Sequence, residues 1–320
     1  MSDLLYLSDQ TLGSLDISSQ DVLSAIEKTV LGVRDGMVAT SPKSGITTDD
    51  GRYLMSTLAA SDDQRLVAIK CVVANERSKA LRLPAVNGGI MLLDSETGQL
   101  RAVLDANWVT GIRTAGMSLL AARHLANPDS NTLGLIGAGV QAESHLRAFA
   151  QSFPLNRVVA VGRGEKNVRR LESVAQDLNL TFEQSDAEST LAVADIVIST
   201  VTRDFSIVPF LDVRWLRPGA FAAMPDLSIP WLPEYLQVFD QVYIDDLAQE
   251  RVMEKPVVAS ELVTGELADL VAGNIQYDPQ KISAFVFRGT AAGDLAVASL
   301  AYHRAITGQR NQADEANDNF

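Results

Sequence analysis

The sequence has few of the residues from which disulfides and metal sites are built. It contains one cysteine, Cys71, and three histidines far apart in the chain, His124, His145 and His303. One cysteine excludes a disulfide within the chain, and no Cys/His spacing matches that of zinc ligands. Low cysteine usage is also typical of a reducing compartment. We therefore expect a cytoplasmic protein without a bound metal.

Long apolar runs and an excess of basic residues are also missing. No apolar run approaches the roughly 20 residues of a membrane-spanning helix, and the N-terminal MSDLLYLSDQ has no basic start. Lys and Arg number 27 against 40 Asp and Glu, which gives a formal net charge of −13. Because nucleic-acid phosphates bind basic surfaces, we expect neither nucleic acid nor membrane as a partner.

The first third of the chain reads as a leading helix followed by strands. Over residues 20–36, valine and isoleucine recur at three- and four-residue spacing, which is typical of an amphipathic helix. Apolar patterning predicts strands at 53–59, 66–73, 90–94 and 99–104, and a helix at 110–126. Residues 1–126 therefore form a β-rich domain in this interpretation, completed by a last helix within 291–320.

Residues 127–290 show a different pattern, in which short apolar segments alternate with helical ones. The strands are expected at 132–139, 157–162, 194–201, 219–224 and 241–246, with helices at 141–152 and 165–178. Such alternation predicts right-handed crossovers and a parallel sheet. The fold class is thus α/β, with a Rossmann-like NAD(P)-binding domain at 127–290 beside the β-rich domain.

A glycine-rich turn follows the first of these strands. Gly137, Gly139 and Ala142 form G-x-G-x-x-A between a strand and a helix. The first glycine permits a tight turn, the second lets the backbone approach a pyrophosphate, and the small third residue allows close packing. A helix N-terminus favours an anion. We expect this turn, including Val140 and Gln141, to bind a dinucleotide.

The end of the second strand bears on the choice between NAD and NADP. An NAD enzyme usually carries Asp or Glu there for the ribose hydroxyls, whereas this chain has Arg163, followed by Lys166. These cations could hold a 2′-phosphate, which favours NADP(H) and leaves NAD(H) possible. The alternative is an arginine exposed to solvent in a turn.

Three charged residues occupy positions that are unfavourable without a partner. Lys70 lies within the apolar run LVAIKCVV and shares a face with its apolar neighbours, so it needs an anionic ligand or a structural carboxylate. Arg113 falls in the first turn of the helix expected at 110–126, where a bound anion would offset the helix dipole; it could also face solvent. Asp226 follows the strand at 219–224, where a carboxylate can act as acid or base, or cap a turn.

These residues, in this order, resemble the ornithine cyclodeaminase/μ-crystallin family from about residue 40 to 305. The arginine-bearing helix together with IGAGVQA is specific to that family. The segments that carry the resemblance are AIKCV (68–72), LPAVNGGIMLLDSETG (83–98), TGIRTAGMSLLAARHLA (110–126), IGAGVQAESH (136–145), ADIVISTVT (194–202) and WLRPGAFAAM (215–224).

The resemblance implies roles for several residues. Lys70 and Arg113 match the residues that contact the substrate carboxylate, with Lys70 also near the imine or carbonyl, and Lys43 matches a second carboxylate contact. Asp226 approximates the catalytic aspartate, although MPDLSIPW is shorter than the family stretch. Asn87 stands where members often have glutamine and is assigned to the substrate site. Thr200 and Val201 end the strand at 194–201 and Thr202 follows it, and all three are assigned to the cofactor.

The family resemblance also implies a homodimer formed through the β-rich domain, which binds the substrate. The implied activity is NAD(P)H-dependent imine reduction or amino-acid dehydrogenation, with hydride transfer at C2 of a small amino or imino acid. Two alternatives stay open. One is a cyclodeaminase that recycles bound NAD and releases ammonia, and the other is a non-catalytic, crystallin-like NADPH-binding protein.

Overall fold

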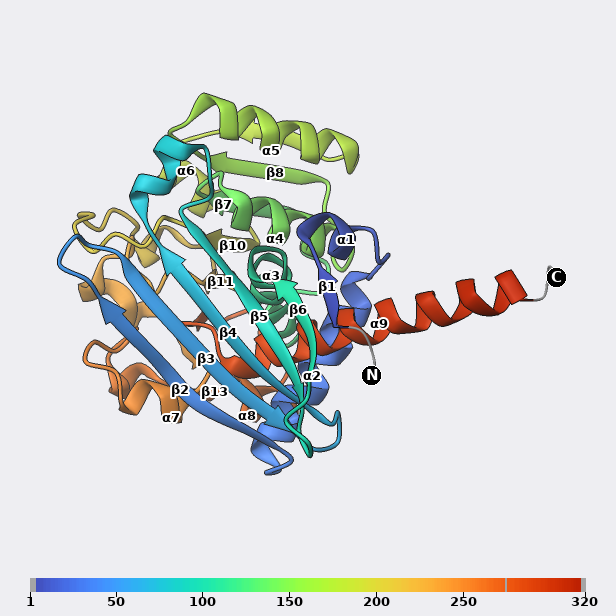
Figure 1. Ribbon diagram of the computed structural model, residues 1–320. Helices are drawn as coiled ribbons and strands as arrows, with labels where there is room; N and C mark the ends of the chain where they lie inside the picture. Colours follow the sequence, from blue (N-terminus) through green and yellow to red (C-terminus); the bar gives the residue numbers. More distant parts are fainter. Residues whose placement is uncertain (1–3, 274, 318–320) are drawn as a thin grey trace. The chain divides into compact units, whose positions relative to one another are not determined.

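The computed structural model describes residues 4–273 and 275–317, and the chain divides into two compact units (Figure 1). Unit 1 combines the chain up to Arg113 with the part from Thr290 onward, and unit 2 runs from Thr114 to Gly289. The division falls inside helix α3 (Ala106–Leu125), whereas the sequence placed a boundary after residue 126, at the end of that helix. We describe each unit separately.

Unit 1 is built on a six-stranded sheet. In chain order its elements are β1 (Leu5–Leu7), α1 (Asp9–Gly13), α2 (Ser19–Arg34), β2 (Val38–Thr47), β3 (Tyr53–Ser61), β4 (Leu66–Ala74), the 3-10 helix η1 (Glu76–Leu81), β5 (Val86–Asp94), β6 (Leu100–Asp105), the start of α3, and α9 (Ala291–Asn317). The strand order is β1-β6-β5-β4-β3-β2. Only the pairing of β1 with β6 is parallel among these neighbours. The predicted leading helix and four strands are therefore present.

The two faces of this sheet differ in what covers them. Helices α2 and α9 pack together, and α9 lies against β2, β3, β4 and β5 (Figure 1). The strand pairing aligns one row on the face toward α9: Leu7, Leu104, Ile90, Lys70 and Thr57, all buried. The residue beside each of these along its own strand belongs to a second row, on the opposite face. This row consists of Tyr6, Val103, Met91, Ile69 and Leu58. We call this second, apolar row the outer row.

The sequence did not predict strand β2. It contains Pro42, and its register against β3 shifts between Ser41 and Ser44. Proline removes a backbone donor and is tolerated on edge strands and at bulges, and β2 lies at one edge of this sheet. Lys43 lies in that irregular stretch.

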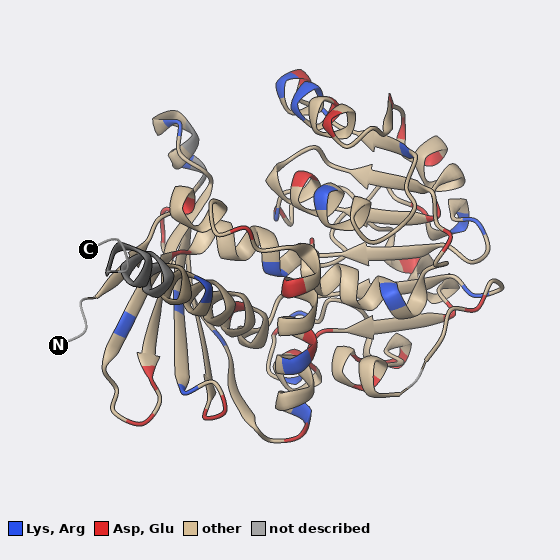
Figure 2. Cartoon of the chain, turned by 90° about the vertical axis from the view of Figure 1, so that its right-hand side faces the viewer, with Lys and Arg blue, Asp and Glu red and all other residues tan. Residues whose placement is uncertain are grey.

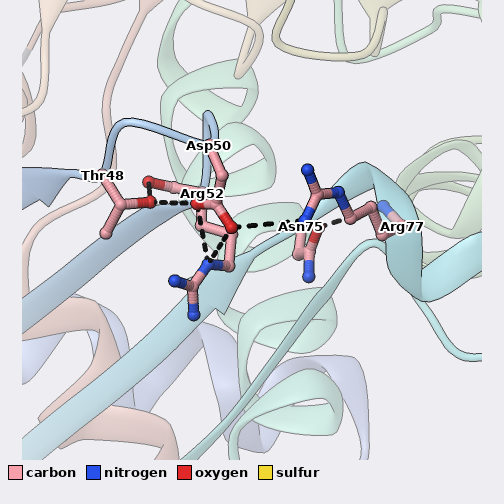
Figure 3. Close-up of polar contacts among 5 residues, drawn as sticks. All are labelled: Thr48, Asp50, Arg52, Asn75 and Arg77. Atoms are coloured by element: carbon pink, nitrogen blue, oxygen red, sulfur yellow. Dashed lines mark hydrogen bonds and ion pairs between the residues drawn. The ribbon is translucent and has the colours of Figure 1, made fainter.

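A polar cluster ties the β2–β3 turn to the segment after β4 (Figure 3). The carboxylate of Asp50 accepts from the Thr48 hydroxyl at 2.5 Å, from Arg52 Nε at 2.9 Å and from Arg77 Nη1 at 3.3 Å. The Arg77 backbone N–H donates to Asn75 Oδ1 at 3.0 Å. The side chains of Arg52 and Arg77 are 44% and 71% exposed, so these pairs organise the turn and add little stability.

Unit 2 contains an eight-stranded sheet whose strand pairs are all parallel. After α3 its elements are β7 (Thr132–Ile136), α4 (Val140–Ala150), β8 (Arg157–Val161), α5 (Glu165–Asp177), β9 (Thr181–Gln184), α6 (Ala187–Val193), β10 (Ile196–Ser199), η2 (Val213–Trp215), β11 (Phe221–Met224), η3 (Pro233–Val238), β12 (Gln241–Ile244), α7 (Leu247–Arg251), η4 (Ser260–Leu262), β13 (Gly265–Glu266), α8 (Leu267–Ala272) and β14 (Ser283–Val286). The strands themselves carry few charges (Figure 2). The predicted parallel sheet is confirmed.

The strand order of unit 2 is β13-β12-β14-β11-β10-β7-β8-β9. The chain starts in the middle at β7, adds β8 and β9 on one side, and then returns to add β10 and β11 on the other. This reversal between β7 and β10 is the topological switch point of a Rossmann-like sheet, where ligands bind at the carboxyl ends of the strands. Strand β14, between β11 and β12, was not predicted.

Helix α3 begins earlier than the sequence indicated. It follows β6 directly at Ala106, where the carboxylate of Asp105 accepts from the Asn107 backbone N–H at 2.7 Å. Arg113 therefore lies in the second turn of the helix, and the predicted placement in the first turn was wrong. The argument from the helix dipole does not apply to it. Every helix in the described part of the chain is too short or too polar to span a bilayer.

Candidate active-site residues

A buried carboxylate joins two of the predicted site residues in unit 1. Asp294, in the first turn of α9, accepts from Lys70 Nζ at 2.9 Å and from Arg113 Nε at 3.1 Å, both on Oδ1. Its Oδ2 accepts from the Thr57 hydroxyl at 2.9 Å. The side chains of Lys70, Arg113 and Asp294 are 1%, 7% and 2% exposed. The alternative that Arg113 faces solvent was wrong.

Two sources of negative charge were open for Lys70, a ligand or a structural carboxylate, and the structure contains the carboxylate. It does not remove the need for a further anion, because one carboxylate faces two buried cations. Lys43, half-buried on β2, also acts electrostatically on Asp294. Lys70 and Arg113 thus share one buried carboxylate, and Lys43 lies near enough to act on it.

The protonation of this cluster follows from burial and neighbouring charges. Burial lowers the pKa of Lys70 to about 8, with Asp294 opposing the shift and Arg113 adding to it. Burial would by itself raise the pKa of Asp294, but Lys70, Arg113 and Lys43 together hold it below its usual value. Asp294 is therefore ionised at neutral pH, and Lys70 can exchange a proton near the physiological range.

Asn87 is placed differently from the other predicted substrate residues. Its amide nitrogen donates to the Pro84 carbonyl at 2.6 Å, and its Oδ1 accepts from Asn107 Nδ2 at 3.2 Å. These bonds fix the start of β5 to the start of α3. The hydrogen bonds of the Asp294 cluster do not include Asn87, so its assignment to the substrate site stays a prediction.

The glycine turn of unit 2 has the backbone that the motif predicts. Gly137 has φ +106°, and a Cβ there would lie 2.8 Å from the Thr200 carbonyl oxygen, so both conformation and space require glycine. A Cβ on Gly139 would point into open space, and this residue caps α4 without a side-chain acceptor. Ala142 is fully buried. The turn and the helix N-terminus suit the pyrophosphate of a dinucleotide.

The remaining cofactor candidates differ in exposure. Val140 is 62% exposed at the start of α4, and Arg163 and Lys166 are exposed after β8. Thr200 lies against the glycine turn, with its backbone N–H donating to the Ile136 carbonyl at 2.7 Å, while Thr202 is exposed. The exposed position of Arg163 is compatible with both of its predicted alternatives.

Asp226 lies just beyond β11, at the carboxyl edge of the parallel sheet. It is 5% exposed and accepts from the Ser199 hydroxyl at 2.9 Å and the Val201 backbone N–H at 3.1 Å. Burial raises its pKa to about 7, although both hydrogen bonds oppose the shift. The next two residues, Leu227 and Ser228, both have positive φ, a strained backbone that is common beside functional groups.

The structure adds residues to the candidate site that were not predicted from the sequence. Asp294 and Thr57 complete the cation cluster, and Ser199 holds Asp226 while accepting from Trp231 Nε1 at 3.0 Å. Asp294 did leave a signal, since it is the one acidic residue among the apolar residues that open α9. Among the described residues, no group of three or more His, Cys, Asp or Glu could hold a metal ion.

The sequence matches a known protein family over almost its whole length. The family model described as ornithine cyclodeaminase/mu-crystallin family matches residues 7–309. The ketimine reductase mu-crystallin of Mus musculus is 28% identical over 263 residues, covering 80% of this chain and 81% of that protein.

Two solved structures share the fold over almost the whole chain. Thermococcus litoralis Δ1-pyrroline-2-carboxylate reductase, in complex with NADH and L-proline, has a TM-score of 0.85 at 24% identity and covers 96% of this chain and 98% of its own. An archaeal alanine dehydrogenase dimer with bound NAD has a TM-score of 0.84 at 24% identity, with 96% and 97% coverage. At this identity the likeness establishes the fold.

Proposed function

The chain belongs to the ornithine cyclodeaminase/mu-crystallin family, and on that premise we propose that it is a nicotinamide-dependent oxidoreductase for small 2-imino or 2-amino acids. In the reductive direction, an imino acid, NAD(P)H and a proton give the amino acid and NAD(P)⁺. Relatives named as ketimine reductase and iminosuccinate reductase support imine reduction.

The observation that carries this proposal is the excess of buried cations around Asp294. Lys70 and Arg113 share one carboxylate oxygen of Asp294, so two buried cations face one buried negative charge. A buried charge without compensation is costly, so this site favours an anion. The donor to Asp294 is Nε of Arg113, and a guanidinium has four further N–H groups on its two Nη atoms. Those groups suit a substrate carboxylate.

We assign the cofactor to unit 2 and the substrate to unit 1. The Gly137 turn, the N-terminus of α4 and Thr200–Thr202 would hold a dinucleotide, with Arg163 and Lys166 favouring the 2′-phosphate of NADP(H). The bound nicotinamide supplies or accepts the hydride. Two structures of the same fold are described with NADH or NAD. The proposed preference for NADP(H) therefore rests on Arg163 of this chain.

Proton transfer is assigned to two residues of this chain. Lys70, as an ammonium, would hydrogen-bond the imine nitrogen and stabilise the charge that develops there. Asp226, with a pKa of about 7, can both give and take a proton at neutral pH, as a general acid–base requires.

We also propose that the protein is a homodimer formed through the face that carries the outer row. Three members of that row are exposed apolar side chains: Tyr6 at 65%, Leu58 at 43% and Met91 at 41%. Burying such side chains stabilises an interface. A relative of the same fold is described as a dimer.

The test is a substrate screen read at the NADPH absorbance, using cyclic imines and mixtures of 2-oxo acids with amines. Steady NADPH consumption with one of them supports the proposal. Ammonia release from a diamino acid without net cofactor turnover would instead identify a cyclodeaminase. Binding of NADPH without turnover of any 2-imino or 2-amino acid would identify a crystallin-like protein.

A further inference from the structure

Asp294 is the point at which three separate elements of unit 1 meet α9. Its carboxylate accepts from Thr57 on β3, Lys70 on β4 and Arg113 on α3, at 2.9, 2.9 and 3.1 Å. All four residues are buried. The two cations reach the same oxygen, Oδ1, whereas Thr57 alone bonds Oδ2. This division fixes the plane of the carboxylate and, with it, the positions of both cations.

The charges that act on Lys70 come from two directions, and only one of them favours its protonated form. Among the described residues, Asp294 faces it from α9 as a negative charge and Arg113 from α3 as a like charge, while Lys43 on β2 acts on Asp294. Its direct neighbours on the adjacent strands, Thr57 and Ile90, are uncharged. With burial and Arg113 both opposing the ammonium form, Asp294 is what keeps the proton on Lys70.

We propose that Asp294 is a positioning residue for the reaction, which keeps Lys70 protonated and turns Arg113 so that its Nη groups remain for the substrate carboxylate. The inference rests on the proposed function and adds a residue to it. Asp294 would not touch the reacting atoms, and its effect passes through Lys70 and Arg113. A merely structural carboxylate would stabilise the fold without setting the protonation of Lys70.

The experiment compares wild type with Asp294→Asn, Asp294→Glu and the control Asp50→Asn. Asp50 is a matched control because it also pairs with two cationic side chains of unit 1, here Arg52 and Arg77, but on the surface. The main readout is the titration of the Lys70 side chain, followed by the Cε chemical shift in ¹³C-lysine-labelled protein and assigned with Lys70→Arg. The second readout is the pH profile of kcat/KM for an imine found in the substrate screen.

In Asp294→Asn we expect the Lys70 midpoint to fall by about 1–3 pH units, the usual effect of losing an opposite charge at contact distance. The corresponding limb of the kcat/KM profile should move to lower pH, and activity at pH 8 should fall at least about fivefold. Asp294→Glu should give a midpoint between those of wild type and Asp294→Asn, and Asp50→Asn should leave both readouts unchanged. NADH binding serves as the check that each variant is folded.

An unchanged Lys70 midpoint in folded Asp294→Asn overturns the proposal, even if the variant is less stable. If that variant does not fold, Asp294→Glu decides instead, because it keeps the negative charge but displaces the carboxylate from Lys70 by one methylene group. A lower Lys70 midpoint and a displaced pH profile then support the proposal, and unchanged values overturn it. The titration needs no substrate, so an absence of imine reduction in wild type would refute the proposed function while the role of Asp294 in Lys70 protonation is still decided.

Discussion

Ser118 on α3 and His145 on α4 are joined by a buried hydrogen bond of 2.9 Å between Ser118 Oγ and His145 Nε2. The other ring nitrogen, Nδ1, lies 2.7 Å from the Gln141 carbonyl oxygen, which can only accept. Nδ1 therefore carries the proton, and Nε2 accepts from Ser118. The neutral imidazole holds the first turn of the helix that follows the glycine turn, and protonation of Nε2 would require the Ser118 hydroxyl to accept instead of donate.

The first prediction is that His145 makes the protein sensitive to acid. Burial lowers its pKa from 6.5 to about 4, so the folded state binds this proton less well than the unfolded state. The stability that the neutral His145 contributes is fully present above about pH 6.5. As the pH falls toward 4, the free energy of unfolding decreases by up to about 3 kcal/mol. His145→Gln should make the free energy of unfolding less dependent on pH across that window, measured by urea denaturation at several pH values.

The control for this prediction is His303→Gln, which changes an exposed histidine on α9. It should leave the pH dependence of wild type in place. Equal pH dependence in wild type and His145→Gln would contradict the assignment of a neutral, buried imidazole.

The second prediction concerns Asp226 and activity. Because its pKa is raised to about 7, the kcat/KM profile of wild type should have a limb near pH 7. Asp226→Asn keeps the size of the side chain, and the Ser199 hydroxyl can accept from the new amide, so the fold should persist. We expect a loss of about 10²- to 10⁴-fold in kcat, the usual contribution of a general acid–base, and loss of that limb in stopped-flow or steady-state assays.

Asp212→Asn is the matched control for Asp226. Asp212 is also a buried aspartate of unit 2, but it pairs with Arg214, whose hydrogen bonds lower its pKa. This variant should keep the limb near pH 7. If Asp226→Asn retains both the limb and the rate, another group carries the proton.

The sequence could predict the architecture of unit 2 because apolar strands and amphipathic helices alternate there over short distances. It was less informative where a strand lacks that pattern. Pro42 and the polar residues around it hid β2. The early start of α3 was missed because β6 runs into it without a loop, which also misplaced Arg113 within the helix.

The candidate site shows a related limit. Lys70 and Arg113 stood out as charges in apolar or helical contexts, and that conflict is visible locally. Their partner Asp294 is separated from them by 224 and 181 residues, and no local periodicity reports a contact over such a distance. The sequence could therefore predict that a negative charge was needed, but not which residue supplies it.

The third prediction tests the preference for NADP(H). Arg163→Ala should weaken NADPH binding by about 10- to 150-fold, the range expected for a charge-assisted hydrogen bond, and should change NADH binding little. Fluorescence titration of both cofactors measures this. Arg169→Ala is the control, since this exposed arginine on α5 pairs with Glu165. Equal affinity of the wild type for NADPH and NADH would contradict the proposed role of Arg163.

The fourth prediction is a dimer held by the outer row. Leu58, Ile69 and Met91 lie directly beside one another on β3, β4 and β5, and Val103 and Tyr6 extend the row across β6 and β1. Sedimentation at micromolar concentration should therefore give a mass twice that of one chain. Replacing both Leu58 and Met91 by lysine puts charges in the middle of this apolar face and should shift the mass to that of one chain.

A lysine in place of an exposed apolar residue elsewhere tests whether the loss of the dimer comes only from a general change in surface charge. Val208, which is 81% exposed in unit 2, provides that control, and Val208→Lys should remain dimeric. The paired Leu58 and Met91 variant should also lose activity, because the row on the opposite face of the same strands contains Lys70 and Thr57, and a loosened sheet would disturb their bonds to Asp294. A wild-type protein that sediments as one chain with full activity would exclude this dimer.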